Sequence, residues 1–168
     1  MRSSASRELA NSDARSDSSS SRALKVIGVD PGVTATGFGV LEVRPGGVTV
    51  VDAGVISTTT GHALEARLNA LHQAVHRIID MQKPSLLIVE DLYTEYKFPR
   101  TAVLMGHARG VIYLAARQLG VSVVALAPSE VKRAVTGNGS AGKVQVQRAV
   151  QNLFSLERVP HPPDVAEE

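Results

Sequence analysis

The sequence predicts an α/β fold in which a five-stranded mixed sheet is flanked by helices on both faces. Three extended segments follow one another in the first third of the chain and are joined by short turns. Helical and extended segments then alternate. A run of consecutive strands followed by helix–strand alternation is typical of a layered sheet whose strands run in mixed directions.

The strands are predicted from short runs of β-branched and apolar residues that are bounded by turn residues. The first run contains Val26, Ile27 and Val29 and closes at Asp30, after which Pro31 and Gly32 break it. The five predicted strands cover residues 24–30, 34–43, 48–58, 85–90 and 121–126.

The helices are predicted from apolar residues that recur with the helical period. The first helix ends before Lys83 and Pro84, and Gly120 ends the second. The third, short helix is predicted instead from residues 128–130, which can cap a helix start. The four predicted helices cover residues 62–81, 101–119, 128–135 and 143–154.

Length and composition exclude several classes of protein. The 168 residues suffice for one domain with a sizeable core. No apolar run reaches the roughly 18 to 20 residues that a membrane-spanning helix needs. The chain has no cysteine, which excludes disulfides, zinc–thiolate sites and a cysteine nucleophile. This composition fits the reducing cytoplasm, where we expect the protein to act.

Charge and composition vary along the chain. Residues 1–22 contain nine serines and four arginines and almost nothing to bury, so we expect a disordered tail there and a single domain over residues 23–168. Residues 91–150 carry a net charge of +5, whereas residues 23–90 carry −1 and residues 151–168 carry −3. A basic middle beside acidic segments indicates a polyanionic partner and a cation-binding site.

Acidic residues stand at the ends of predicted elements. Asp30 closes the first strand and Glu90 the fourth, so both project from one edge if these strands are neighbours. Asp164 and Glu167 are spaced to share one face of a short helix. Converging carboxylates repel one another and need cations, and oxygen donors without cysteine favour magnesium or manganese over zinc. Alternatively, residues 30–32 form only a polar turn between strands.

The chain resembles the RuvC family of Holliday-junction resolvases, which belongs to the RNase H-like superfamily. The likeness is carried, in family order, by residues 29–32, 36–40, 89–93, 106–110, 128–132, 137–146 and 162–166. It implies a metal-dependent endonuclease of DNA recombination and repair. Such an enzyme acts as a homodimer, nicks two opposed strands of a four-way DNA junction symmetrically, and works with a junction-binding, branch-migration helicase complex rather than at a membrane.

The resemblance also implies roles for individual acids. Asp30, Glu90 and Asp164 match the metal-binding acids of the family, and Glu167 stands where the family usually has Asp and sometimes His. We expect two Mg²⁺ ions per site, with Mn²⁺ as a substitute, to place a phosphate between an attacking water and a leaving oxygen. Because the family's final helix continues past these acids, we expect the final acidic helix to be truncated in this sequence.

Several further residues are expected to contact DNA. Tyr93 matches an aromatic residue that meets bases at the junction centre, which requires only an exposed π-face. Lysines and arginines bind phosphate without reading sequence. The expected phosphate contacts are Lys132, Lys143, Lys97 and Arg100. Arg109 either extends this basic surface or supports its own helix.

Three other interpretations account for parts of the sequence. An incomplete final helix would leave a protein that binds junctions without cutting them. Residues 137–143 nearly match a P-loop, but Val144 stands where the magnesium-binding Ser or Thr belongs and no strand leads into the loop. Residues 30–37 resemble the phosphate hairpin of actin, Hsp70 and sugar-kinase ATPases, which need two such domains around the nucleotide.

Overall fold

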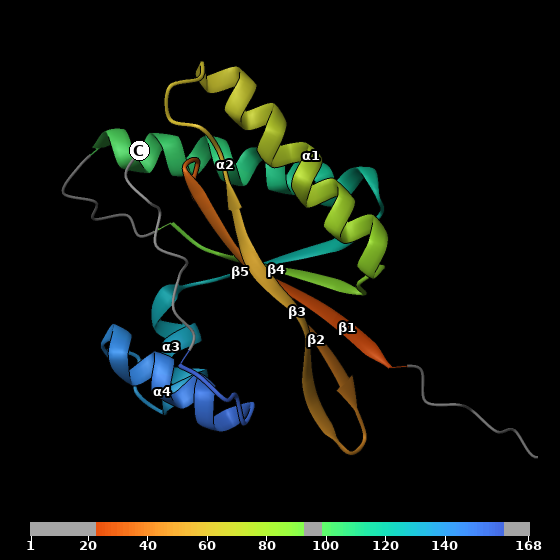
Figure 1. Ribbon diagram of the computed structural model, residues 1–168, viewed down its shortest axis with the longest axis vertical. Helices are drawn as coiled ribbons and strands as arrows, with labels where there is room; N and C mark the ends of the chain where they lie inside the picture. Colours follow the sequence, from red (N-terminus) through yellow and green to blue (C-terminus); the bar gives the residue numbers. More distant parts are fainter. Residues whose placement is uncertain (1–22, 93–98, 160–168) are drawn as a thin grey trace, which may run out of the picture.

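The structure is a computed structural model that describes residues 23–92 and 99–159. Within this part of the chain, five strands and four helices follow one another in the predicted order (Figure 1). The strands are β1 (Leu24–Asp30), β2 (Ala35–Arg44), β3 (Gly47–Ser57), β4 (Leu86–Glu90) and β5 (Ser122–Leu126). The helices are α1 (Leu64–Gln82), α2 (Pro99–Gln118), α3 (Pro128–Thr136) and α4 (Lys143–Leu153). Each element lies within about two residues of its predicted bounds.

The five strands form one mixed sheet, as the sequence predicts, and the structure gives their order as β3-β2-β1-β4-β5. The first three strands form an antiparallel meander, since β1 pairs with β2 and β2 with β3. The last two lie parallel to β1, because a helix carries the chain back before each of them. The strands β1 and β4 are therefore sequence-distant neighbours at the centre of the sheet.

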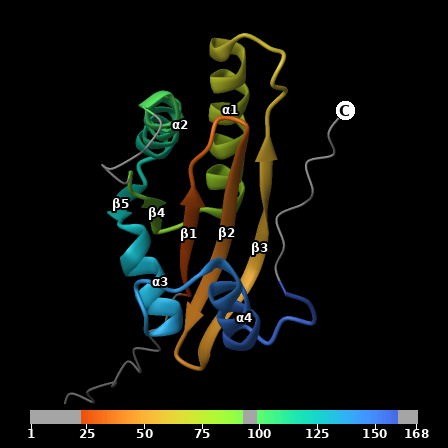
Figure 2. The same cartoon turned by 90° about the vertical axis from the view of Figure 1, so that its left-hand side faces the viewer.

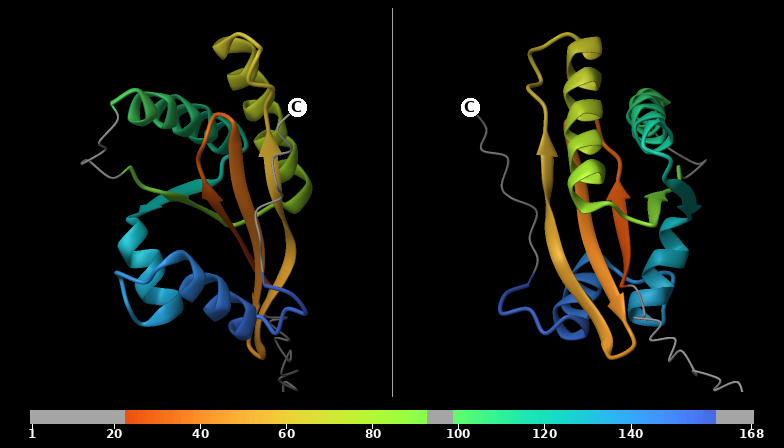
Figure 3. Two further views of the ribbon diagram at one scale, coloured as in Figure 1. Left: turned by 60° about the vertical axis from the view of Figure 1, so that its left-hand side comes forward. Right: turned by 90° about the vertical axis from the view of Figure 1, so that its right-hand side faces the viewer.

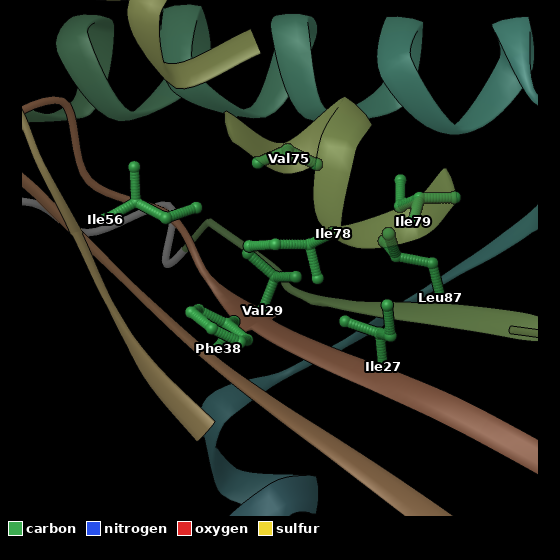
Figure 4. A pocket seen from close by; sticks show the side chains of 8 residues that line it. All are labelled: Ile27, Val29, Phe38, Ile56, Val75, Ile78, Ile79 and Leu87. Atoms are coloured by element: carbon green, nitrogen blue, oxygen red, sulfur yellow. The ribbon is translucent and has the colours of Figure 1, made fainter. Parts of the chain in front are cut away.

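One face of the sheet forms the core with α1 and α2. Side chains alternate between the two faces of a strand, so Ile27 and Val29 of β1 share this face with Leu87 and Val89 of β4. All four are at least 94% buried. Figure 4 shows Ile27, Val29 and Leu87 meeting side chains of α1. The residues of α2 that reach the core are mostly small, namely Ala108, Ile112, Ala115 and Ala116.

The opposite face of the sheet meets α3, which packs with α4 away from the α1–α2 pair (Figures 2 and 3). Val26 and Gly28 of β1, Ile88 of β4 and Val131 and Val135 of α3 line a groove of about 490 Å³ between sheet and helix. Helices thus lie on both faces, as predicted. Among the described residues, none of the helices combines the length and the apolar composition that a membrane span requires.

Candidate active site

Asp30 and Glu90 lie side by side at one end of the groove. The strands β1 and β4 run parallel, and their register pairs Val29 with Val89, so the next residue of each strand is an acid. Since Val29 and Val89 point into the core, strand alternation turns Asp30 and Glu90 toward the opposite face. Both acids line the groove beside α3. The fold therefore brings together two carboxylates that are sixty residues apart in the sequence.

The electrostatics of the pair reflect this placement. Burial by the surrounding protein raises the pKa of Asp30 above its ordinary value. Burial also raises the pKa of Glu90, the negative charge of Asp30 raises it further, and the positive charge of Lys132 opposes both effects. The remainder of the groove is lined mainly by apolar side chains and glycines, which hydrate a charge poorly. Two carboxylates in such surroundings favour a cation.

The turn after β1 holds Asp30 in place. The hydroxyl of Thr36, which is fully buried, donates to the carbonyl oxygen of Gly32 at 2.6 Å and accepts from its amide at 3.2 Å. A Cβ at Gly32 would lie 2.3 Å from the carbonyl oxygen of Ala35, so this position admits only glycine without a shift. Across the sheet, Asp30 pairs with Gly37, which leaves the carboxylate open on the β2 side.

Glu90 is held from the other side of the sheet. Glu90 pairs with Leu126 of β5, and the amide of Asp91 donates to the Leu126 carbonyl oxygen at 2.8 Å. The guanidinium of Arg109, on α2, donates to the Glu90 carbonyl oxygen at 2.6 Å. Arg109 is 8% exposed, so the structure gives it a structural contact at the site rather than a place on the basic surface. In the sequence, the only indication of this role is that Arg109 lies among small residues in the segment 106–110.

The other predicted site residues are distributed as follows. Lys132, on α3, lies close enough to lower the pKa of Glu90. Lys143 is the exposed first residue of α4, and Arg100 lies exposed in the first turn of α2. Tyr93, Lys97, Asp164 and Glu167 lie outside the described residues. Within the described ranges, no three acidic or histidine side chains come together as a metal cluster.

Comparisons with known proteins show the family to which the chain is related. Residues 26–168 match the family model for the crossover junction endodeoxyribonuclease RuvC. The chain is 41% identical to a RuvC of this description from Rhodopirellula baltica over 84% of its own length and 80% of the relative's. A second such protein, from Pelotomaculum thermopropionicum, is 42% identical over 84% of the chain and 86% of the relative.

Solved structures give the same result. The RuvC of T. thermophilus in complex with a Holliday junction substrate is 30% identical and superposes with a TM-score of 0.77, over 83% of this chain and 85% of that one. The yeast mitochondrial Holliday junction resolvase Ydc2, 11% identical with a TM-score of 0.54 over 77% of this chain and 61% of that one, shares the fold.

These findings favour the nuclease interpretation over the ATPase interpretation and over that of a junction-binding protein without cleavage activity. The loop 137–143 also follows a helix, α3, whereas a P-loop follows a strand. The chain belongs to the RuvC family of crossover junction endodeoxyribonucleases.

Proposed function

We propose that the protein resolves four-way DNA junctions in homologous recombination and repair by hydrolysing one phosphodiester bond in each of two opposed strands. The observation that carries this proposal is the pair of Asp30 and Glu90 at neighbouring strand ends, with Lys132 beside it. Carboxylates that converge on one point, with a cation from a third element, suit a reaction at a phosphate.

Membership of the family implies that catalysis depends on a divalent metal ion. The described donors fit such an ion, because both are carboxylates and each has a pKa raised by its surroundings. Hard divalent cations prefer oxygen ligands, so we assign Mg²⁺, with Mn²⁺ as a substitute. Asp30 and Glu90 would hold it, and we propose that Asp164 and Glu167 complete a site for two ions. Bound there, the metal supplies Lewis-acid stabilisation of a phosphate and of the water that attacks it.

The protein's own cations have a separate task. The phosphate gains negative charge as the water attacks. We propose that Lys132, whose charge acts on Glu90, helps to neutralise it. Lys143 begins α4, which packs against α3, so both lysines belong to one helical unit. We assign both to phosphate contacts, together with Arg100 and Lys97. Tyr93, three residues after Glu90, is the proposed contact to an unpaired base.

Cutting two opposed strands requires two sites, and we propose that a second copy of the chain supplies the other. One side of α2 packs on the sheet, whereas Val103 and Leu114 on its outer side are 59% and 50% exposed. His107 and Gly110, both exposed, lie between them. The spacing of four, three and four residues is that of a helix-pairing stripe. Gly110 lacks a side chain and lets a second helix approach closely.

We infer the remaining partners from the family alone. A junction-binding, branch-migration helicase complex would deliver the substrate, and the reaction would take place in the cytoplasm.

A cleavage assay tests this function. The whole chain is incubated with an end-labelled four-way junction in Mg²⁺, with Ca²⁺ as the control cation and a linear duplex as the control substrate. We expect paired, symmetric nicks in the junction in Mg²⁺ only. Junction binding without nicks in Mg²⁺ or Mn²⁺ would contradict the proposal and favour the non-cleaving interpretation.

The dimer has its own test. Leu114→Glu places a charge in the exposed stripe without touching the core, and analytical ultracentrifugation should then show the monomer. The monomer should nick single strands and lose the paired cuts. An unchanged dimer with paired cuts would place the interface elsewhere.

A further inference from the structure

Arg109 makes an unusually complete set of contacts for a helical arginine. Its Nη1 lies 2.6 Å from the Glu90 carbonyl oxygen and 2.8 Å from Oδ1 of Asp91. Its Nη2 donates to the hydroxyl of Tyr113, one turn further along α2, at 2.6 Å. The guanidinium also lies 5.4 Å from the centre of the Tyr113 ring. The side chain is 10% exposed, whereas that of Asp91 is 50% exposed.

These contacts lie at the end of β4, where the strand pairings of the sheet end. The ladder between β1 and β4 ends at Val29 and Val89, one residue before the two acids. On the β5 side the last links are the Glu90–Leu126 pair and the Asp91 amide bond. Immediately beyond, Asp91 accepts from the Leu92 amide at 2.8 Å. Arg109 therefore ties the end of β4 to α2 at the point where strand pairing gives out.

The chemistry of this position is specific to arginine. A planar guanidinium reaches a carbonyl oxygen, a carboxylate and a phenol hydroxyl at once from fixed directions. A lysine ammonium keeps the charge but reaches these acceptors from a single point. The carboxylate of Asp91 neutralises the buried charge of Arg109. Arg109 therefore does not need the carboxylate of Glu90 as a counter-ion, and this carboxylate lines the groove.

We propose that Arg109 is a positioning residue that fixes the Glu90 carboxylate for metal binding. The proposal rests on the function proposed above, because it concerns the same site. Groups that orient metal ligands from behind typically change metal affinity or activity by about 10–100-fold when they are removed. Arg109 acts in this way through the backbone, from the helix that also carries the proposed dimer stripe.

The test compares Arg109→Met and Arg109→Lys with the unmodified protein. We expect Arg109→Met to lower kcat for junction cleavage and to weaken Mn²⁺ binding, measured by calorimetry, by about 10–100-fold each. Junction affinity in EDTA should stay within about threefold, since Arg109 is buried away from solvent. Arg109→Lys should give intermediate values for kcat and Mn²⁺ affinity.

Ile112→Ala is the matched control. Ile112 is fully buried on the same helix, and its truncation weakens helix–sheet packing without changing a hydrogen bond at β4. We expect this variant to melt at a lower temperature and to keep the Mn²⁺ affinity and kcat of the unmodified protein. Equal losses of Mn²⁺ affinity in Ile112→Ala and Arg109→Met would reduce Arg109 to a packing role and overturn the proposal.

The remaining outcomes separate the two proposals. If Arg109→Met does not fold, Arg109→Lys becomes the test of the proposal. An Mn²⁺ affinity and a kcat equal to those of the unmodified protein in Arg109→Lys would refute the positioning role. If the unmodified protein neither binds Mn²⁺ nor cuts junctions, the proposed function fails. If it does both and Arg109→Met equals it, only the role of Arg109 fails.

Discussion

Substitution of Gly32 by alanine tests how finely the turn after β1 places Asp30. The backbone at Gly32 is not left-handed, so the constraint is one of space alone. A Cβ built there lies 2.3 Å from the Ala35 carbonyl oxygen, and real Cβ atoms stay at least 3.0 Å away. The turn must therefore open by about 0.7 Å. Asp30 is two residues away.

Two effects follow from this displacement. Overpacking typically destabilises a protein by about 1–3 kcal/mol, and the loss of unfolded-state freedom from Gly to Ala returns about 0.4–1 kcal/mol. We expect a net loss of about 1–2 kcal/mol, which lowers Tm by about 2–8 °C in a chain of this length. Misplacement of a catalytic group by about 1 Å reduces rates by as much as about 100-fold, so cleavage should slow by about tenfold or more.

Single-turnover cleavage of a labelled junction and thermal unfolding measure the two effects separately. Gly46→Ala, at the tip of the β2–β3 hairpin, is the matched control, because a Cβ there meets nothing within 4 Å. It should cut at the unmodified rate and melt at the same or a slightly higher temperature. If Gly32→Ala melts and cuts like Gly46→Ala, the argument that this turn positions Asp30 is wrong.

Four further predictions concern the site and the chain around it. Glu90→Gln should abolish cutting while junction binding persists. The same variant also has a pH-dependent effect on stability. Because burial and Asp30 raise the pKa of Glu90 above 4.5, the folded protein holds the proton of the Glu90 carboxyl more tightly than the unfolded chain does. The ionised carboxylate therefore destabilises the metal-free protein above that raised pKa. Glu90→Gln should raise Tm at pH 7 and leave it unchanged near pH 3. An equal gain in Tm at both pH values would contradict this argument. Thr36→Val leaves the Gly32 carbonyl without its partner and should cost about 1–3 kcal/mol by urea unfolding, whereas an unchanged midpoint would show that the turn does not depend on this hydroxyl. Lys143→Ala should slow cleavage and reduce the salt slope of junction binding by about one, and an unaltered slope would remove this lysine from the phosphate contacts. Deletion of residues 1–22 should leave the cleavage rate unchanged, and a large loss would show that this segment takes part.

Most of the fold was predictable because its signals are local. Apolar runs and turn residues defined each strand, helical periodicity defined α1, α2 and α4, and the capping residues 128–130 defined α3. The end of β1 at Asp30 and of β4 at Glu90 follows from the residues themselves. The family likeness added the metal-binding and DNA-contacting roles expected of individual residues. The roles of Asp164, Glu167, Tyr93 and Lys97 remain predictions, since these residues lie outside the described ranges.

Tertiary structure decided what lies behind and beside the two acids. The pairing of β1 with β4 sets Asp30 next to Glu90, and the docking of α3 brings Lys132 near them. Arg109 illustrates the limit most clearly, because the sequence allowed either an exposed phosphate contact or a structural helix residue. Which of these two roles Arg109 has depends on which side of α2 faces the end of β4.

The sequence by itself thus determined the elements, their order, and the acids that close two of the strands. Only the tertiary structure decided which groups hold those acids and that Arg109 and Lys132 lie beside them. The physical reason is that periodicity and turn chemistry depend on neighbours along the chain, whereas the bond from Arg109 to Glu90 joins residues nineteen positions apart, on a helix and a strand whose packing no local pattern specifies.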